Sequence, residues 1–145
     1  MTAEQITLLQ EFGFQVGEDD HRGRTQIYCE NIPDLLSLEM LILTMTFQEE
    51  INYWDADWYS PTDPGGYVSA LRLDNERVAY KEGNHGWASH WYIVTIKEMA
   101  EHIQKNWNQD CDRGKFLNCI WIERNDHITK DKIREKLSKE SKLSF

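Results

Sequence analysis

The chain has 145 residues, of which 40% are hydrophobic and 12% aromatic, and its formal charge is −9. This length is typical of one domain, and the aromatic content excludes a disordered chain. The longest apolar run, Leu35 to Met45, is too short and too polar to cross a bilayer, and no basic-then-apolar signal begins the sequence. We therefore expect a soluble, cytoplasmic protein, and we treat residues 1–145 as a single domain because no linker rich in Pro, Gly or Ser divides them.

The N-terminal residues predict a helix, a loop and a strand. Thr2 and Gln5 have the spacing of a capping box, and apolar residues follow at helical spacing as far as Gly13, a natural helix stop. Residues 17–24 are polar and predict a loop. Residues 25–30 have the composition of a short strand.

The next segment is ambiguous between helix and strand. A helix is expected over residues 33–40, because Pro33 suits a first helical turn and the apolar residues that follow have helical spacing. Beyond Leu41 a strand is a serious rival, since the run to Phe47 is rich in Ile, Thr and Phe. The sequence leaves open whether residues 41–54 are helix or strand.

The middle of the chain predicts antiparallel strands. Residues 60–66 form a loop with two prolines and a glycine pair. Residues 67–73 and 77–80 flank the polar turn Asp74–Glu76, which is a hairpin pattern. Residues 91–96 form the best strand pattern in the chain.

The C-terminal half adds two helices and one more strand. Thr95 and Glu98 make a second capping box, followed by a helix that ends near Asn108. Residues 110–115 predict a loop, residues 116–122 a buried strand, and the tail from Thr129 a highly charged helix.

These elements predict the α+β class, with a mostly antiparallel sheet and helices packed on one face. The consecutive strand, helix and strand between residues 91 and 122 each have an apolar face, so their large apolar side chains should share one core. The predicted members are Trp91, Ile93, Ile96, Met99, Ile103, Trp107, Leu117 and Trp121.

Charge is distributed unevenly along the chain. Residues 1–66 carry 13 acids and two bases, and between Arg24 and Arg72 there are eight acids and no Lys or Arg. Residues 129–145 carry six bases against three acids. A chain of this balance is a poor candidate for direct nucleic-acid binding, which needs clustered Lys and Arg, whereas an acidic face speeds encounter with a basic partner.

The segment from Glu49 to Tyr67 interleaves carboxylates with large aromatic side chains. Aromatic residues give interfaces most of their binding energy, and carboxylates are bidentate partners for Arg. We therefore expect this segment to bind a basic protein partner, unless bases from residues 130–142 bury against it. The predicted contact residues are Glu49, Glu50, Tyr53, Asp55, Asp57, Trp58, Tyr59 and Asp63.

Other chemistry has weaker support in the sequence. The same mixture of rings and acids could line a sugar subsite, and two of its carboxylates could act as the acid and base of a hydrolase. The spacing of His85 and His90 fits structural roles better than a metal pair, and three widely spaced cysteines predict neither a disulfide framework nor a zinc site. We expect no catalytic residues, no metal and no cofactor.

In size, acidity and its acidic–aromatic segment, the chain resembles the small acidic immunity proteins that bacteria pair with secreted toxins. The resemblance is one of class and rests on the segment Glu49 to Tyr67 and on the β-rich layout of residues 67–96. It implies an inhibitor that occludes the active site of a basic toxin, such as a nuclease. A carboxylate-based hydrolase and a carbohydrate-binding domain are the alternatives, and neither the partner's identity nor the oligomeric state follows from the sequence.

Overall fold

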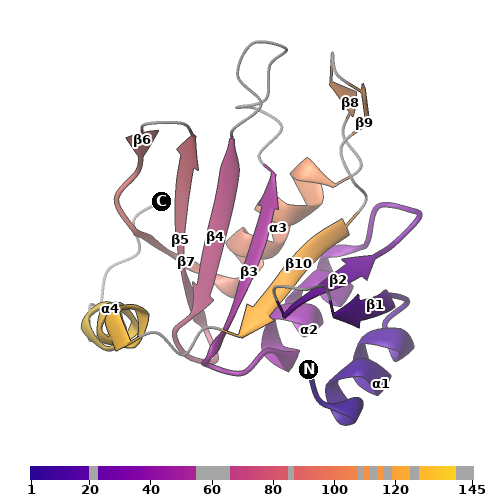
Figure 1. The fold of residues 1–145 in the computed structure, drawn as a ribbon, viewed down its shortest axis with the longest axis horizontal. Helices are drawn as coiled ribbons and strands as arrows, with labels where there is room; N and C mark the ends of the chain where they lie inside the picture. Colours follow the sequence, from indigo (N-terminus) through magenta and orange to yellow (C-terminus); the bar gives the residue numbers. More distant parts are fainter. Residues whose placement is uncertain are drawn as a thin grey trace.

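A computed structural model describes residues 1–145 except 20–22, 55–65, 85–86, 108–109, 112–113, 116–118, 125–127 and 140–145. Helices and strands alternate irregularly along the chain (Figure 1). In order they are α1 (Ala3–Glu11), β1 (Gln15–Asp19), β2 (Arg24–Tyr28), α2 (Leu35–Thr44), β3 (Glu49–Trp54), β4 (Tyr67–Arg72), β5 (Arg77–Asn84), β6 (Trp87–Ala88), β7 (Tyr92–Thr95), α3 (Ile96–Asn106), β8 (Asp110–Cys111), β9 (Gly114–Lys115), β10 (Cys119–Arg124) and α4 (Ile128–Ser138).

The main sheet has the strand order β1-β2-β10-β3-β4-β5-β6, and β7 also pairs with β5. Strands β6 and β7 lie along the same side of β5, because β6 pairs near Gly83 and β7 pairs over Arg77–Tyr80. The paired strands described here run antiparallel, as predicted. Strands β8 and β9 form a separate small hairpin.

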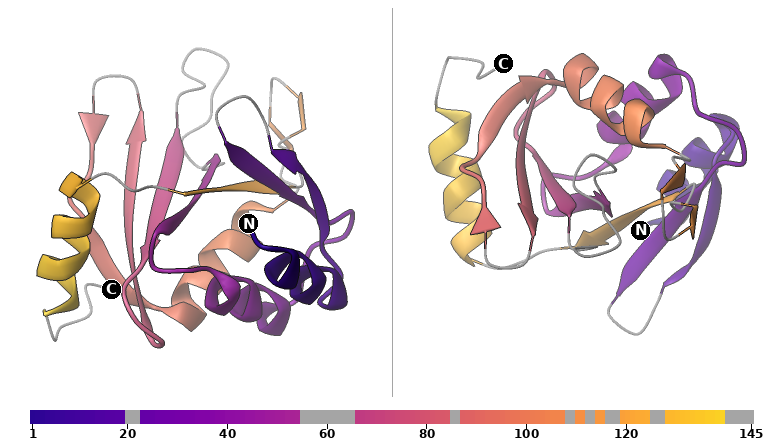
Figure 2. Two further views of the ribbon diagram at one scale, coloured as in Figure 1. Left: turned by 60° about the horizontal axis from the view of Figure 1, so that its bottom comes forward. Right: turned by 90° about the horizontal axis from the view of Figure 1, so that it is seen from above.

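Helices α1, α2 and α3 cover one face of the sheet and enclose the main core with it. Helix α4 packs beside β5 and β7, apart from the other three helices (Figure 2). Its Ile133 and Leu137 contact a smaller cluster that includes Ala79 and Ile93, whose side chains point away from the main core. The predicted α+β class with an antiparallel sheet is confirmed, and α4 adds a helix on the opposite face.

The predicted helix starts are confirmed by their caps. Thr2 accepts a hydrogen bond from the backbone of Gln5, and Thr95 accepts one from the backbone of Glu98; both sites are complete capping boxes. Helix α2 begins instead after Asp34, whose carboxylate accepts the N–H of Ser37. It continues to Thr44, so the ambiguous segment is helix first and strand afterwards.

The prediction of a loop over residues 17–24 is wrong in part, because β1 extends to Asp19 and β2 begins at Arg24. The pairing of Val16 with Ile27 places one apolar pair in the hairpin, and a bulge follows between Val16 and Asp19. Polar composition hid this strand, since β1 is an edge strand with mostly exposed side chains.

The predicted common core is divided between the two faces of the sheet. Ile96, Met99, Ile103 and Trp107 are in the main core, but Ile93 belongs to the cluster under α4. Trp91 also packs against that second cluster. Trp121 is half-buried, with the Arg24 guanidinium over its ring. Leu117 lies outside the described residues. Alternation along a strand explains the division, since neighbouring side chains point to opposite faces.

No helix in the described ranges is long and apolar enough to span a membrane.

The β4–β5 turn depends on Asp74. Its carboxylate accepts hydrogen bonds from the backbone N–H groups of Glu76 and Arg77 and from the Arg77 side chain. Partial burial raises the pKa of Asp74, but these hydrogen bonds and the Arg77 charge outweigh burial and lower it from the ordinary value of 3.8.

We predict that Asp74→Asn lowers the free energy of unfolding by about 1 kcal/mol near neutral pH, because the charge that pairs with Arg77 is lost. A lowered folded-state pKa means that this contribution is present above pH 3.8 and is lost as the pH falls through the lowered value. Urea unfolding at about pH 7 and about pH 3 checks both points. Glu76→Gln, on the same turn, is the control, and an equal loss at both pH values would contradict the prediction.

Candidate functional site

The structure places the first part of the predicted contact segment inside the fold. Glu49, Glu50 and Tyr53 lie on β3 and are 5%, 1% and 4% exposed. They do not form an exposed face. The remaining predicted contacts lie outside the described residues: Asp55, Asp57, Trp58, Tyr59 and Asp63.

Two arginines from elsewhere in the chain reach this region. Arg134 of α4 is 7% exposed and donates to the backbone carbonyl of Glu49 over 3.2 Å. Arg72 donates to the carbonyls of Leu43 and Met45 at the end of α2, over 3.0 and 2.6 Å. A base of the C-terminal helix therefore does bury against the start of the segment, through the backbone of Glu49.

An apolar surface lies along α2 and its flanks. Leu36 and Leu43 are seven residues apart, so they share one face of the helix. Together with the residues before and after the helix they form what we call the α2 surface, with exposed fractions of 55% for Ile32, 66% for Leu36, 36% for Leu43 and 45% for Phe47. Exposed apolar side chains that gather on one face are typical of a binding surface, whereas single exposed ones are normal.

Acidic side chains border the α2 surface. Glu30 and Asp34 are exposed and Glu39 is half-exposed. The hydrogen bond from the backbone of Ser37 lowers the pKa of Asp34, which keeps this carboxylate charged at the N-terminus of α2. Helix α3, which packs against α2, exposes Lys97 and Lys105. Because α3 also exposes Glu101, it presents charges of both signs, whereas the charged side chains of α2 and its flanks are all acidic.

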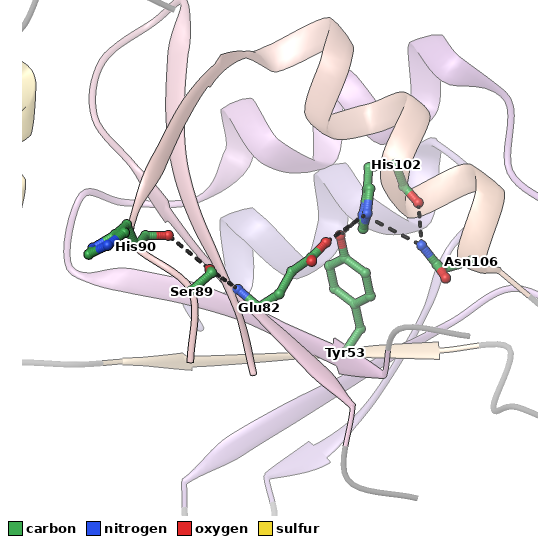
Figure 3. Close-up of polar contacts among 6 residues, drawn as sticks. All are labelled: Tyr53, Glu82, Ser89, His90, His102 and Asn106. Carbon is green, nitrogen blue, oxygen red and sulfur yellow. Dashed lines mark hydrogen bonds and ion pairs between the residues drawn. The ribbon is translucent and has the colours of Figure 1, made fainter. Parts of the chain in front are cut away.

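A second group of polar residues lies between α3 and the sheet (Figure 3). We call Tyr53, Glu82, His102 and Asn106 the His102 cluster. The Tyr53 hydroxyl lies 2.6 Å from Nδ1 of His102, and a Glu82 carboxylate oxygen lies 3.5 Å from Nε2. Asn106 donates to the backbone carbonyl of His102 over 3.0 Å.

The His102 cluster joins β3, β5 and α3. The imidazole lies near the rings of Tyr53 and Tyr80, with centroid separations of 5.9 and 5.6 Å. With Glu82 at one nitrogen and Tyr53 at the other, the ring can pass a proton between a carboxylate and a phenol. His102 and Glu82 are each 18% exposed, so the cluster is mostly, but not fully, shielded from water.

Sequence reasoning did not find the His102 cluster. It considered His85, which lies outside the described residues, and His90, which is exposed and whose backbone carbonyl accepts from Ser89. One signal was available: His102 and Asn106 are four residues apart, beside Met99 and Ile103 on the apolar face of the helix. Two polar residues on a buried face require partners.

A scan against protein-family models and searches of curated proteins and of solved structures give no match. Function therefore rests on the geometry of this chain alone.

We predict that Tyr53→Phe lowers the free energy of unfolding by about 1 kcal/mol, because it removes the hydroxyl at Nδ1 of His102 and keeps the buried ring. Tyr28→Phe is the matched control, with an expected change within about 0.5 kcal/mol. Chemical denaturation of both variants measures the difference. Equal stability of the two variants would show that the contact to His102 contributes nothing.

Proposed function

We propose that this chain is a protein-binding inhibitor: an immunity protein that neutralises a basic toxin, such as a nuclease, by covering its active site. The main support is the α2 surface, where exposed apolar side chains lie in the stretch of sequence that holds eight acids and no base between Arg24 and Arg72. An apolar centre with a charged rim is the usual anatomy of a protein interface.

The apolar and acidic parts of this surface have different roles in the proposal. Leu36 and Phe47 lose water on contact and slow dissociation, because buried apolar area holds the complex together. Asp34 and Glu39 speed association with a basic partner, because opposite charges steer the encounter. Exposed charges are screened beyond about 8 Å at physiological ionic strength, so only the association rate should fall steeply with salt.

A hydrolase is a second candidate, supported by the His102 cluster. A carboxylate, an imidazole and a hydroxyl in that order are the parts of a general acid–base site. Tyr53 is 4% exposed, so a substrate would have to reach it past His102 and Glu82. Turnover of a chromogenic ester, phosphodiester or glycoside that is lost in His102→Gln and kept in Leu36→Glu would favour this candidate over the inhibitor.

The inhibitor proposal predicts a complex with the product of the adjacent gene, since immunity proteins are encoded beside their toxins. We expect Leu36→Glu to raise the dissociation rate about tenfold or more and to abolish protection of cells that express the toxin. Surface plasmon resonance at two salt concentrations measures both rates. Glu135→Gln, on α4, is the control and should bind normally.

The same assay tests the contact residues predicted from the sequence. Trp58→Ala or Tyr59→Ala should raise the dissociation rate, and neutralising Asp55 and Asp57 should slow association, if that segment also touches the partner. Unchanged binding in these variants would leave the interface to α2. Unchanged binding in Leu36→Glu as well would remove the inhibitor proposal.

A further inference from the structure

A polar cavity of about 370 Å³ opens beside the start of β3. Its walls come from the beginning of α1, the β1–β2 hairpin, the segment between α2 and β3, and the end of β10. The side chains that matter for its chemistry are Gln5, Asp19, Thr25, Glu49 and Arg124.

Glu49 is the central group of this cavity. The residue is 5% exposed, and its Oε1 accepts hydrogen bonds from Nε2 of Gln5 and from the backbone N–H of Thr46, each over 2.8 Å. In the part of the chain that the structure describes, no donor reaches its Oε2, and this oxygen is not sealed from solvent. A carboxylate that is more than nine-tenths buried therefore presents an unpartnered oxygen to the cavity.

The charges around Glu49 favour a cation. Asp19 lines the same cavity and uses one oxygen to accept the Thr25 hydroxyl. Glu18 lines a neighbouring cavity of about 380 Å³ that shares Asp19 and Thr25. Arg124 stands opposite Glu49 in the strand register, but no ion pair joins these two side chains. Three carboxylates thus lie in this region with two cationic groups, the Arg124 guanidinium and the α-amino group of Met1, which lines both cavities.

We propose that the cavity binds a guanidinium group, presented as an Arg side chain by the basic partner. A guanidinium is planar, offers five N–H donors and is weakly hydrated, so it can meet Glu49 Oε2 and the Asp19 carboxylate at a low desolvation cost. The assignment to a partner rests on the proposed function. Thr46 at the cavity precedes Phe47 of the α2 surface, so one partner can cover the surface and fill the cavity.

The local structure also orients the Glu49 carboxylate for such a group. Nε2 of Gln5 donates both to Glu49 and to the carbonyl of Thr44 at the end of α2, over 2.8 and 3.1 Å. The carboxylate is therefore oriented by two elements before any ligand arrives. A preorganised acceptor binds more tightly, because the ligand does not have to order it.

The test is an NMR titration with methylguanidinium, using methylurea as a neutral probe of the same shape. We expect methylguanidinium to shift the Gln5 side-chain and Thr46 backbone signals with a Kd on the order of millimolar, and methylurea to shift neither. Glu49→Gln keeps an oxygen that can accept from Gln5 and Thr46 but removes the charge, so the fold should survive while methylguanidinium binds about tenfold more weakly or not at all. Glu101→Gln, on α3, is the matched control.

The result of this titration does not depend on the result of the toxin-binding test of the α2 surface. Equal binding of both probes, or unchanged binding in a folded Glu49→Gln, would overturn the cavity proposal whatever Leu36→Glu does to the complex. Weaker toxin binding by Glu49→Gln places an Arg of the partner in the cavity. If Glu49→Gln no longer binds methylguanidinium but binds the toxin normally, the cavity binds a guanidinium group but not one from the partner. That result would assign the cavity to a small free guanidinium compound instead.

Discussion

The insertion of β10 between β2 and β3 holds the sheet together. Without this strand, the β1–β2 hairpin and the β3–β4–β5 meander would be two separate pieces, because no pairing links β2 to β3 directly. The pairings of Ile120 with Ile27 and of Ile122 with Ile51 place apolar residues from three distant segments in one core. Such non-local pairing costs loop entropy before it gains contacts, so we expect β10 to join the sheet late in folding.

This insertion also creates the cavity beside Glu49. Arg124 and Glu49 are brought opposite each other by the β10–β3 register, and the β2 strand on the other side of β10 brings Thr25 to the same wall. The strand residues of the cavity wall, Thr25, Glu49 and Arg124, therefore come from strands that the junction aligns, whereas Gln5 comes from α1. A register shift of one residue would turn Glu49 to the other face of the sheet.

The position of Arg72 has a different cause, the unpaired carbonyls at the end of α2. The last turn of α2 leaves carbonyl groups without intrahelical partners, and Arg72 satisfies those of Leu43 and Met45. Burial lowers the pKa of Arg72, and the charge of Asp74 opposes that effect. The ring of Phe47 lies 4.8 Å from the Arg72 guanidinium, so this arginine also fixes one end of the α2 surface.

Local sequence signals predicted the local structure well. The two capping boxes and the turn at Asp74 depend on residues three or four positions apart, and all three stand as expected. The end of α2, the edge strand β1 and the burial of Glu49 depend on partners far along the chain. Glu49 was predicted to lie on the surface because its carboxylate has no base nearby in sequence, whereas in the fold its partners are Gln5 and the backbone of Thr46. Gln5, Glu49 and Arg124 are so far apart in the sequence that no local pattern shows that they line one cavity.

The His102 cluster and the cavity beside Glu49 differ in one respect. The stability of the fold is enough to explain the residues of the first site but not the charge of Glu49 in the second. In the His102 cluster the imidazole has a contact at each ring nitrogen. These contacts join β3, β5 and α3, and this structural role is enough to explain why the residues are there. Glu49 is different, because it places a negative charge in a mostly buried position with one oxygen unpartnered, and Gln at the same position would carry no charge. In the cavity proposal, a cationic group of a partner offsets this destabilisation, since the carboxylates of Asp19 and Glu18 beside Glu49 favour a cation.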